Sequence, residues 1–194
     1  MSRKVRRVPF HLDAGGVRTL PPEEIRAILR GADDLIMRGG RNLLTRVLKG
    51  SRAKEVLEAG LERSPVYGYY RQLSPEEILA RVDWVILNGY LTIQYDYRLP
   101  LLVYTPQGWE IERGTYASEL LAGIDALLAA GSPGFKMDYL KDKPRDLILL
   151  LLDKVEVTGD RKYLPLLEAW ERVDYKKVRQ RIRQVIHRLD QAAR

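Results

Sequence analysis

The sequence predicts a mainly α-helical protein that carries one small β-hairpin. Apolar side chains recur at the spacing of one helix face in several segments of the 194-residue chain, which is the pattern of amphipathic helices. One stretch, residues 90–104, is instead rich in Tyr, Leu and β-branched residues around a short turn, which is typical of two paired strands. With 45% hydrophobic residues and no cysteine, the chain can bury a core, and disulfides and thiolate metal sites are excluded.

Residues 1–32 are predicted to form an N-terminal arm and a first helix. The arm begins Ser2-Arg3-Lys4-Val5-Arg6-Arg7 and shows no helical periodicity. Such a basic arm fits a role along a DNA backbone, and a frayed terminus that only aids solubility fits it equally well. Pro21-Pro22-Glu23-Glu24 then starts the helix, because proline and acidic residues favour helix starts. Gly39-Gly40 allows a sharp reversal into the next helix.

Residues 33–113 hold three further helices and then the hairpin, an order that predicts a winged helix. The first of these helices ends at Gly50, and Ser51 offers a cap to the second. Ser74-Pro75-Glu76-Glu77 starts the third with a capping serine, a proline and two acids. Trp84 falls on the polar side of this third helix. We expect it to pack on the C-terminal part of the chain, and contact with a ligand is the alternative. The expected strands are residues 90–95 and 101–104, joined by residues 96–100.

Positive charge is concentrated in the first part of the chain. Residues 1–60 carry 13 Lys or Arg against 7 Asp or Glu, whereas residues 61–113 carry 5 against 7. A polyanion is the expected partner, because each phosphate contact releases counterions, and a merely solvated helix face is the alternative. Two of the cations oppose the dipole of the expected second helix, which hints at an anion there. No acid interrupts the basic run Arg38, Arg41, Arg46, Lys49, Arg52 and Lys54.

Four spaced motifs stand out in this part of the chain: Leu48-Lys49-Gly50-Ser51, Ser64-Pro65-Val66-Tyr67-Gly68, residues 84–91 with their Asn-Gly-Tyr-Leu ending, and Tyr104-Thr105 to Gly108. Together they resemble the RQC domain of RecQ-family DNA helicases, over roughly residues 33–113. The resemblance implies a winged helix that binds duplex DNA at a junction, and it implies no catalysis.

The resemblance also assigns roles to single residues. It implies that Lys49 and Ser51 contact phosphate, with simple capping by Ser51 as the alternative. It places Tyr95 or Tyr97 near the wing-tip aromatic that splits a terminal base pair in RQC domains of the human type. Because Pro100 limits the start of the second strand, we expect plain backbone contact through Arg98 instead of strand separation. The predicted DNA-binding residues are Arg38, Arg41, Arg46, Lys49, Ser51, Arg52, Lys54, Arg71, Tyr95, Tyr97 and Arg98.

Residues 114–194 are predicted to form a helical C-terminal domain. A helix over residues 109–130 is expected to be interrupted at Gly114, and Gly131-Ser132-Pro133-Gly134 breaks it. One later helix pair is weakly similar to HEAT repeats, which makes a protein partner bound by these helices a second hypothesis. The further expected helices cover residues 144–157, 163–170 and 175–189.

The motifs of an ATP-driven motor are missing from the sequence. There is no Walker-type phosphate loop and no dinucleotide fingerprint, and acid pairs such as Glu23-Glu24 are explained by helix dipoles. We therefore expect a non-enzymatic protein with no catalytic residues, cofactor or metal, although acids converging from several elements in a nuclease site stay an alternative. The most apolar run, residues 147–152, is far too short for a membrane, which predicts a cytoplasmic protein, nucleoid-associated or not. The resemblance to RecQ-family domains implies a role in DNA repair or replication.

Overall fold

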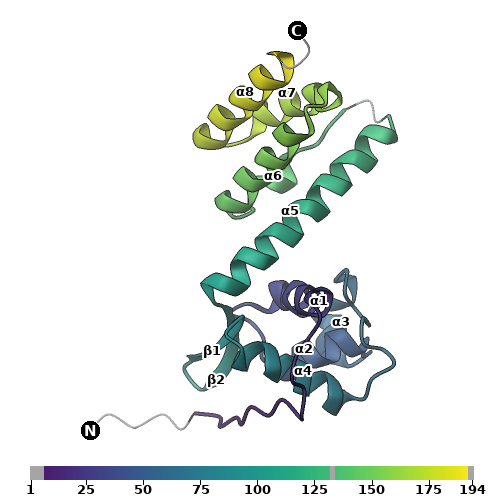
Figure 1. Cartoon of the computed structure of the whole chain (residues 1–194), viewed down its shortest axis with the longest axis vertical. Coiled ribbons are helices and arrows are strands. Elements are labelled where there is room, and N and C mark those ends of the chain that lie inside the picture. Colours follow the sequence, from purple (N-terminus) through teal and green to yellow (C-terminus); the bar gives the residue numbers. More distant parts are fainter. Residues whose placement is uncertain (1–6, 132–133, 192–194) are drawn as a thin grey trace, which may run out of the picture. The chain divides into compact units, whose positions relative to one another are not determined.

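The computed structural model describes residues 7–131 and 134–191, and the chain divides into two compact units, residues 1–112 and 113–194. Each unit has a hydrophobic core of its own. The prediction of a mainly helical protein with one hairpin is confirmed (Figure 1). The elements of the first unit are α1 (Pro22–Ala32), η1 (Asp33–Leu35), α2 (Arg41–Lys49), α3 (Lys54–Glu58), η2 (Leu61–Arg63), α4 (Pro75–Leu87), β1 (Leu91–Asp96) and β2 (Leu99–Tyr104), followed by the first turns of α5 (Pro106–Ala129).

The core of the first unit is built by α1, α2 and α4 together with the inner face of the hairpin. α4 starts as predicted with a complete capping box, in which Ser74 accepts the Glu77 N–H and the Glu77 carboxylate accepts the Ser74 N–H. Trp84 is buried and stacks on Tyr90, with ring centroids 6.1 Å apart, so its aromatic partner lies in the first unit and not in the C-terminal part. Helix α1 shares this core through Ile28 and its apolar neighbours.

The hairpin is longer and more tightly turned than the sequence suggests. β1 and β2 pair antiparallel from Leu91 opposite Tyr104 to Asp96 opposite Leu99, so only Tyr97 and Arg98 form the turn. Pro100 lies inside β2, opposite Tyr95, and therefore does not delay the start of the strand. That expectation was wrong because a proline lacks only the N–H group, and an outer strand can spare one donor.

A short connection ties the hairpin to the helices. The N–H of Met37 donates to the carbonyl of Leu102, and the N–H of Leu102 donates to the carbonyl of Gly39, both over 3.0 Å. A Cβ atom on Gly40 would lie 2.9 Å from the Pro100 carbonyl oxygen. Gly40 has a φ of −102°, so close approach to the hairpin and not a left-handed conformation is what requires glycine here.

Two helix predictions are corrected by the structure. The second predicted helix begins at Lys54 and not at Ser51, because the Ser51 hydroxyl accepts the Ala53 N–H two residues on and closes a local turn instead. α5 runs unbroken through Gly114, where one glycine costs about 1 kcal/mol relative to alanine and a 24-residue helix tolerates it.

The described residues of the second unit form helices joined by short connections and contain no strand. Its core surrounds Trp170 and Tyr163, both almost completely buried. The Tyr163 hydroxyl donates to the Asp125 carboxylate over 2.7 Å, which ties η4 to α5, and this bond lowers the pKa of Asp125. The later elements are η3 (Asp138–Leu140), α6 (Arg145–Thr158), η4 (Arg161–Tyr163), α7 (Leu164–Val173) and α8 (Lys176–Gln191).

Candidate nucleic-acid interface

The fold distributes the predicted basic run over three places. Arg41 and Lys49 occupy the first and last positions of the nine-residue helix α2, which separates them by about 12 Å along its axis at 1.5 Å per residue. Arg38 lies before the helix, beside η1, and the remaining cations gather near its end. A run that is continuous in sequence is therefore not one continuous surface.

The main cluster surrounds the end of α2, and we call it the Gly50 patch: Arg46, Lys49, Ser51, Arg52, Lys54 and Arg71. Gly50 has a φ of +76°, and a Cβ atom on it would lie 3.0 Å from the Cα atom of Gly68. Two glycine backbones therefore touch, and the Arg71 guanidinium lies across them, close to both. This contact brings Arg71 from the following loop to the basic end of α2.

Hydrogen bonds fix the patch to the loop that precedes α4. The Lys49 ammonium donates to the carbonyls of Arg71 and Leu73, each over 2.7 Å, and the Tyr67 hydroxyl donates to the Ser51 carbonyl over 3.0 Å. The N–H groups of Gly68 and Tyr70 satisfy two carbonyls at the end of α2. Lys49 therefore holds the loop in place while its positive charge stays in the patch.

Acidic neighbours neutralise only part of the patch. Arg46 pairs with Glu55, and Lys54 pairs with Glu58 over 3.5 Å, both on the exposed surface. Arg52 and Arg71 are exposed, and within residues 7–131 and 134–191 their side chains form no ion pair. These two guanidinium groups can thus bind an anion without breaking an internal ion pair.

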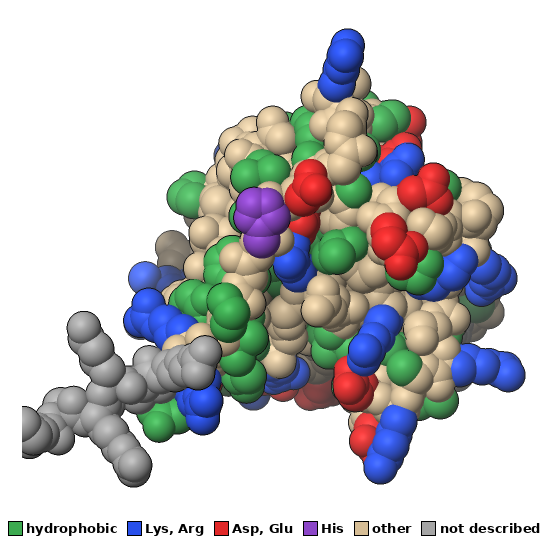
Figure 2. All heavy atoms as spheres, turned by 90° about the horizontal axis from the view of Figure 1, so that it is seen from below, with side chains coloured by type: hydrophobic (Ala, Val, Ile, Leu, Met, Phe, Trp, Pro, Cys, Tyr) green, Lys and Arg blue, Asp and Glu red, His purple; other side chains and the backbone are tan. Residues whose placement is uncertain are grey.

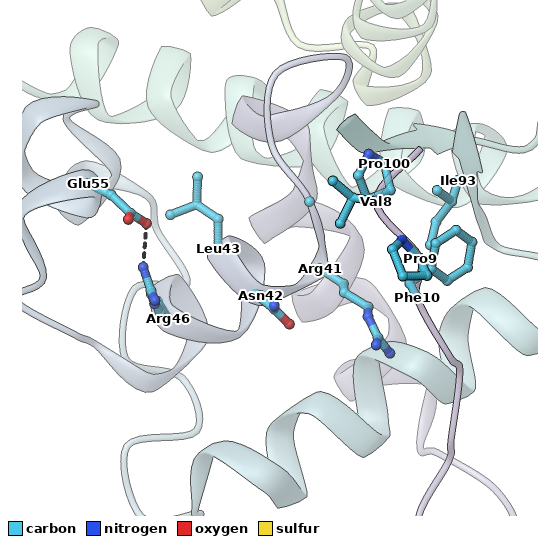
Figure 3. A pocket seen from close by; sticks show the side chains of 11 residues that line it. Val8, Pro9, Phe10, Arg41, Asn42, Leu43, Arg46, Glu55, Ile93 and Pro100 are labelled. Atoms are coloured by element: carbon cyan, nitrogen blue, oxygen red, sulfur yellow. Dashed lines mark hydrogen bonds and ion pairs between the residues drawn. The ribbon is translucent and has the colours of Figure 1, made fainter. Parts of the chain in front are cut away.

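Arg41 has a different role, because it binds a buried carboxylate. Its guanidinium pairs with Asp83 of α4, whose side chain is 2% exposed, and the Asp13 N–H donates to the same oxygen of Asp83 over 2.9 Å. Figure 3 shows Arg41 in a hollow of about 370 Å³ between the N-terminal arm, α2 and the hairpin. Arg46 reaches the same hollow from the other side and pairs there with Glu55 (Figure 3).

Arg38 lines a separate hollow of about 620 Å³. Arg30 and Arg63 also line this hollow, and its apolar part includes Leu35 and Leu61. Arg30 is engaged with Asp33 over 3.4 Å, while the Arg63 side chain is largely exposed. No local pattern joins Arg63 to Arg38, since only the packing of η2 near α1 and η1 places them at one hollow.

The two tyrosines of the wing, Tyr95 and Tyr97, lie in different environments. The Tyr95 hydroxyl donates to the Val8 carbonyl over 2.7 Å, Phe10 lies beside the Tyr95 ring, and the Arg7 guanidinium lies 4.8 Å from the ring centroid. The N-terminal arm thus covers Tyr95. Tyr97, at the turn, is 72% exposed and has a φ of +50°, a conformation that non-glycine residues rarely adopt.

The N-terminal arm continues from the wing to Asp83. Besides covering Tyr95, its Val8 N–H donates to the Arg98 carbonyl at the turn over 3.0 Å. Arg7 is therefore a wing residue that the sequence prediction missed, although the basic composition of the arm was a signal for it. The described part of the arm is extended, as predicted.

The tyrosine-rich loop before α4 supports the fold. The buried Tyr70 hydroxyl donates to the Glu24 carboxylate over 2.6 Å, and burial raises the Tyr70 pKa well above its usual range. Tyr69 packs edge to face on Tyr70, with centroids 4.8 Å apart. Tyr70 therefore packs in the core of the first unit and ties the loop to α1.

The described residues contain no group of three or more His, Asp or Glu side chains placed to hold a metal ion. Among their helices none is both long and apolar enough to pass through a bilayer. Figure 2 shows Lys and Arg side chains spread over one face of the molecule with Asp and Glu among them, so charge alone outlines no single groove.

Three helices, a two-stranded wing and a basic helix end define a winged-helix protein of the DNA-binding class. The family model of the RQC domain matches residues 22–120, which is just over half of the chain. The chain belongs to the RQC domain family, whose members are DNA-binding winged helices of RecQ type. Comparison with curated proteins and with solved structures found no match.

Proposed function

We propose that the first unit binds duplex DNA mainly through phosphates, with the Gly50 patch as its principal contact. The observation that carries this proposal is that two exposed guanidinium groups lie at the basic end of α2. The contact of Gly50 with Gly68 places Arg71 there, and Arg52 follows Gly50 by two residues. Arginine matches phosphate geometry with two parallel hydrogen bonds, so two arginines without internal ion pairs suit contacts with the DNA backbone. Membership of the RQC domain family supports the same ligand.

Arg46 and Lys54 add charge to this contact and can exchange their exposed glutamates for phosphates. Exposed ion pairs contribute little stability, so such an exchange opposes binding only weakly. We assign Arg41 a structural role, because a move of Arg41 from Asp83 to a phosphate would leave a buried carboxylate without its ion-pair partner. Arg38 faces its own hollow and stays a candidate for a more distant phosphate.

We further propose that Tyr97, and not Tyr95, is the wing residue that meets a DNA end or fork. Tyr95 is covered by the arm, whereas Tyr97 is exposed at the turn and held at a positive φ. Glycine would fill this turn position without strain, so the tyrosine is retained at a cost to the hairpin. Base stacking at a duplex end is a role that would account for it.

Substitution of the two free arginines tests the phosphate proposal. R52Q/R71Q should weaken binding to duplexes of different sequence equally and should flatten the slope of log affinity against log salt by about 1.8, since each phosphate bound adds about 0.9 to that slope. The matched control is R18Q/R26Q, which removes two exposed arginines elsewhere in the first unit. Equal losses of affinity in both variants would show that only net charge matters and would refute the Gly50 patch.

Other features of the function stay predictions. These are a protein partner for the C-terminal helices, their HEAT-like character, the division at residues 32/33 and 113/114, the absence of enzymatic activity and the location in the cell. We propose that a partner protein, if one binds, uses the second unit, because the first unit holds the DNA contacts.

A further inference from the structure

The start of α8, in the second unit, carries a cationic cluster that the proposed duplex contact does not use. Lys176, Lys177 and Arg179 lie in the first turns of this 16-residue helix, and all three are exposed. Tyr175, directly before the helix, is 59% exposed, and the ammonium of the exposed Lys141 lies 4.9 Å from its ring centroid. We call these five residues the α8 cluster.

The remainder of α8 shows how an ordinary solvated basic face is arranged in this protein. Its three later arginines each bind acidic side chains of neighbouring helices, so their charges are used within the fold. In the described part of the chain, no such partner is present for Lys176, Lys177 or Arg179. The ion pairs of the later arginines are Arg181 with Asp153 and Glu156, Arg183 with Glu171, and Arg188 with Glu156.

The nearest acid in the sequence is already committed. Asp174 is 8% exposed, and its carboxylate accepts the Trp170 indole N–H over 2.7 Å and the Tyr175 N–H over 2.6 Å. Asp174 is thus the carboxylate at the start of α8, while the first turn of the helix contains no acid and its cations stand at the end where the helix dipole disfavours positive charge. Lys176, Lys177 and Arg179 therefore do not stabilise α8.

The aromatic ring of Tyr175, which lies among these cations, indicates which kind of anion the cluster suits. Tyr175 exposes much of its ring, and Lys141 lies over the ring at cation–π distance. Phosphate binding needs only cations, and an acidic peptide would also need only cations, but a single strand offers bases that stack on an exposed ring. The combination therefore favours a single-stranded nucleic acid over an acidic protein segment.

We propose that the α8 cluster binds single-stranded nucleic acid, with Lys176, Lys177 and Arg179 on phosphates and Tyr175 stacked on a base. This site is separate from the duplex contact of the first unit and does not depend on it. A protein with both sites would hold a duplex and a strand at once, which is the composition of a fork.

The test uses the full chain and a fluorescein-labelled 20-nucleotide oligo(dT), with anisotropy measured at several salt concentrations. All variants carry R52Q/R71Q, so that binding of oligo(dT) by the first unit is kept to a minimum. K176Q/K177Q/R179Q should weaken oligo(dT) binding about 10-fold or more at low salt and should flatten the salt slope by about 2, because each phosphate of a single strand adds about 0.7 to it. The matched control in the same helix is R183Q/R188Q, which should change binding less than about 2-fold.

Thermal melting separates binding from folding in these variants. K176Q/K177Q/R179Q should melt at or above the parent temperature, because it removes cations that oppose the helix dipole, whereas R183Q/R188Q should melt lower. Tyr175→Leu should weaken oligo(dT) binding about 5-fold or more, and Tyr175→Phe should retain it. Unchanged binding in the triple variant, or an equal loss in R183Q/R188Q, would overturn the proposal, whatever the result for duplex binding.

Discussion

The ion pair between Arg41 and Asp83 predicts that Arg41 stabilises the fold, whereas Arg52 and Arg71 bind DNA. Arg41→Gln would leave one Asp83 oxygen with a single partner, the Asp13 N–H, and would leave the other with no hydrogen bond to a described residue. Breaking a fully buried ion pair costs about 3–5 kcal/mol. The Arg41 side chain is 17% exposed and the Asp13 contact survives, so we expect a loss of about 2–3 kcal/mol in the free energy of unfolding.

Denaturant unfolding would measure this loss, with tryptophan fluorescence as the signal for the first unit. Trp84 and Trp109 lie in that unit and Trp170 lies in the other, so far-ultraviolet circular dichroism should be recorded alongside. In a unit of this size, a loss of about 2–3 kcal/mol corresponds to a fall in melting temperature of roughly 8–15 °C. Arg52→Gln, the control, should stay within about 0.5 kcal/mol of the parent.

A second variant removes the charge of the buried Asp83 carboxylate together with that of Arg41. R41Q/D83N should be more stable than Arg41→Gln alone, because a neutral amide is easier to bury than an unpaired carboxylate. If Arg41→Gln keeps its stability but loses duplex affinity as R52Q/R71Q does, then Arg41 binds phosphate and its assignment to the core is wrong.

Two further predictions concern the wing and the cap of α4. Tyr97→Gly should raise the melting temperature slightly, because glycine adopts the positive φ without strain, and should lower fork affinity about 5-fold or more relative to duplex affinity. Tyr95→Ala should mainly lower the melting temperature. An unchanged ratio of fork affinity to duplex affinity in Tyr97→Gly would exclude base stacking at the tip. The Ser74 N–H lowers the pKa of Glu77, so this carboxylate stabilises the fold above its unfolded pKa of about 4.3, and the contribution disappears as pH falls through the lower folded pKa. Glu77→Gln should therefore melt below the parent at pH 7 and converge with it in acid, and a constant difference across that range would contradict the cap assignment.

Local signals in the sequence predicted the parts of the fold that depend on neighbouring residues. The capping box at Ser74 and Glu77 and the β-rich composition of residues 90–104 both act over a few residues, and both appear in the structure. Ser51 failed as a helix start because the same hydroxyl can close a turn on its own backbone, and the sequence alone does not decide between these outcomes. The tie between Met37 and Leu102 has no local signal, because its partners are far apart in the chain.

The candidate site was less predictable than the fold, because its charges depend on distant partners. Arg41 and Arg52 look equivalent in the basic run, yet one meets a carboxylate 42 positions away and the other meets none in the described chain. Arg71 lies at the site through tertiary contacts, namely the approach of two glycine backbones and the hydrogen bond from Lys49 to the Arg71 carbonyl. Residue type set the sign of the charge, and tertiary packing decided which charges stay free.

The attachment of the N-terminal arm to the wing has a practical consequence for any binding measurement. Arg7 and Val8 lie against Tyr95 and the turn. A purification tag or fluorescent protein fused within six residues of Arg7 would be tethered within about 20 Å of the wing tip, because six residues span at most about that distance. A tag of this kind would compete with DNA for space and could itself produce a weak or altered fork preference. Labels for the assays above therefore belong after Arg194 or on the oligonucleotide.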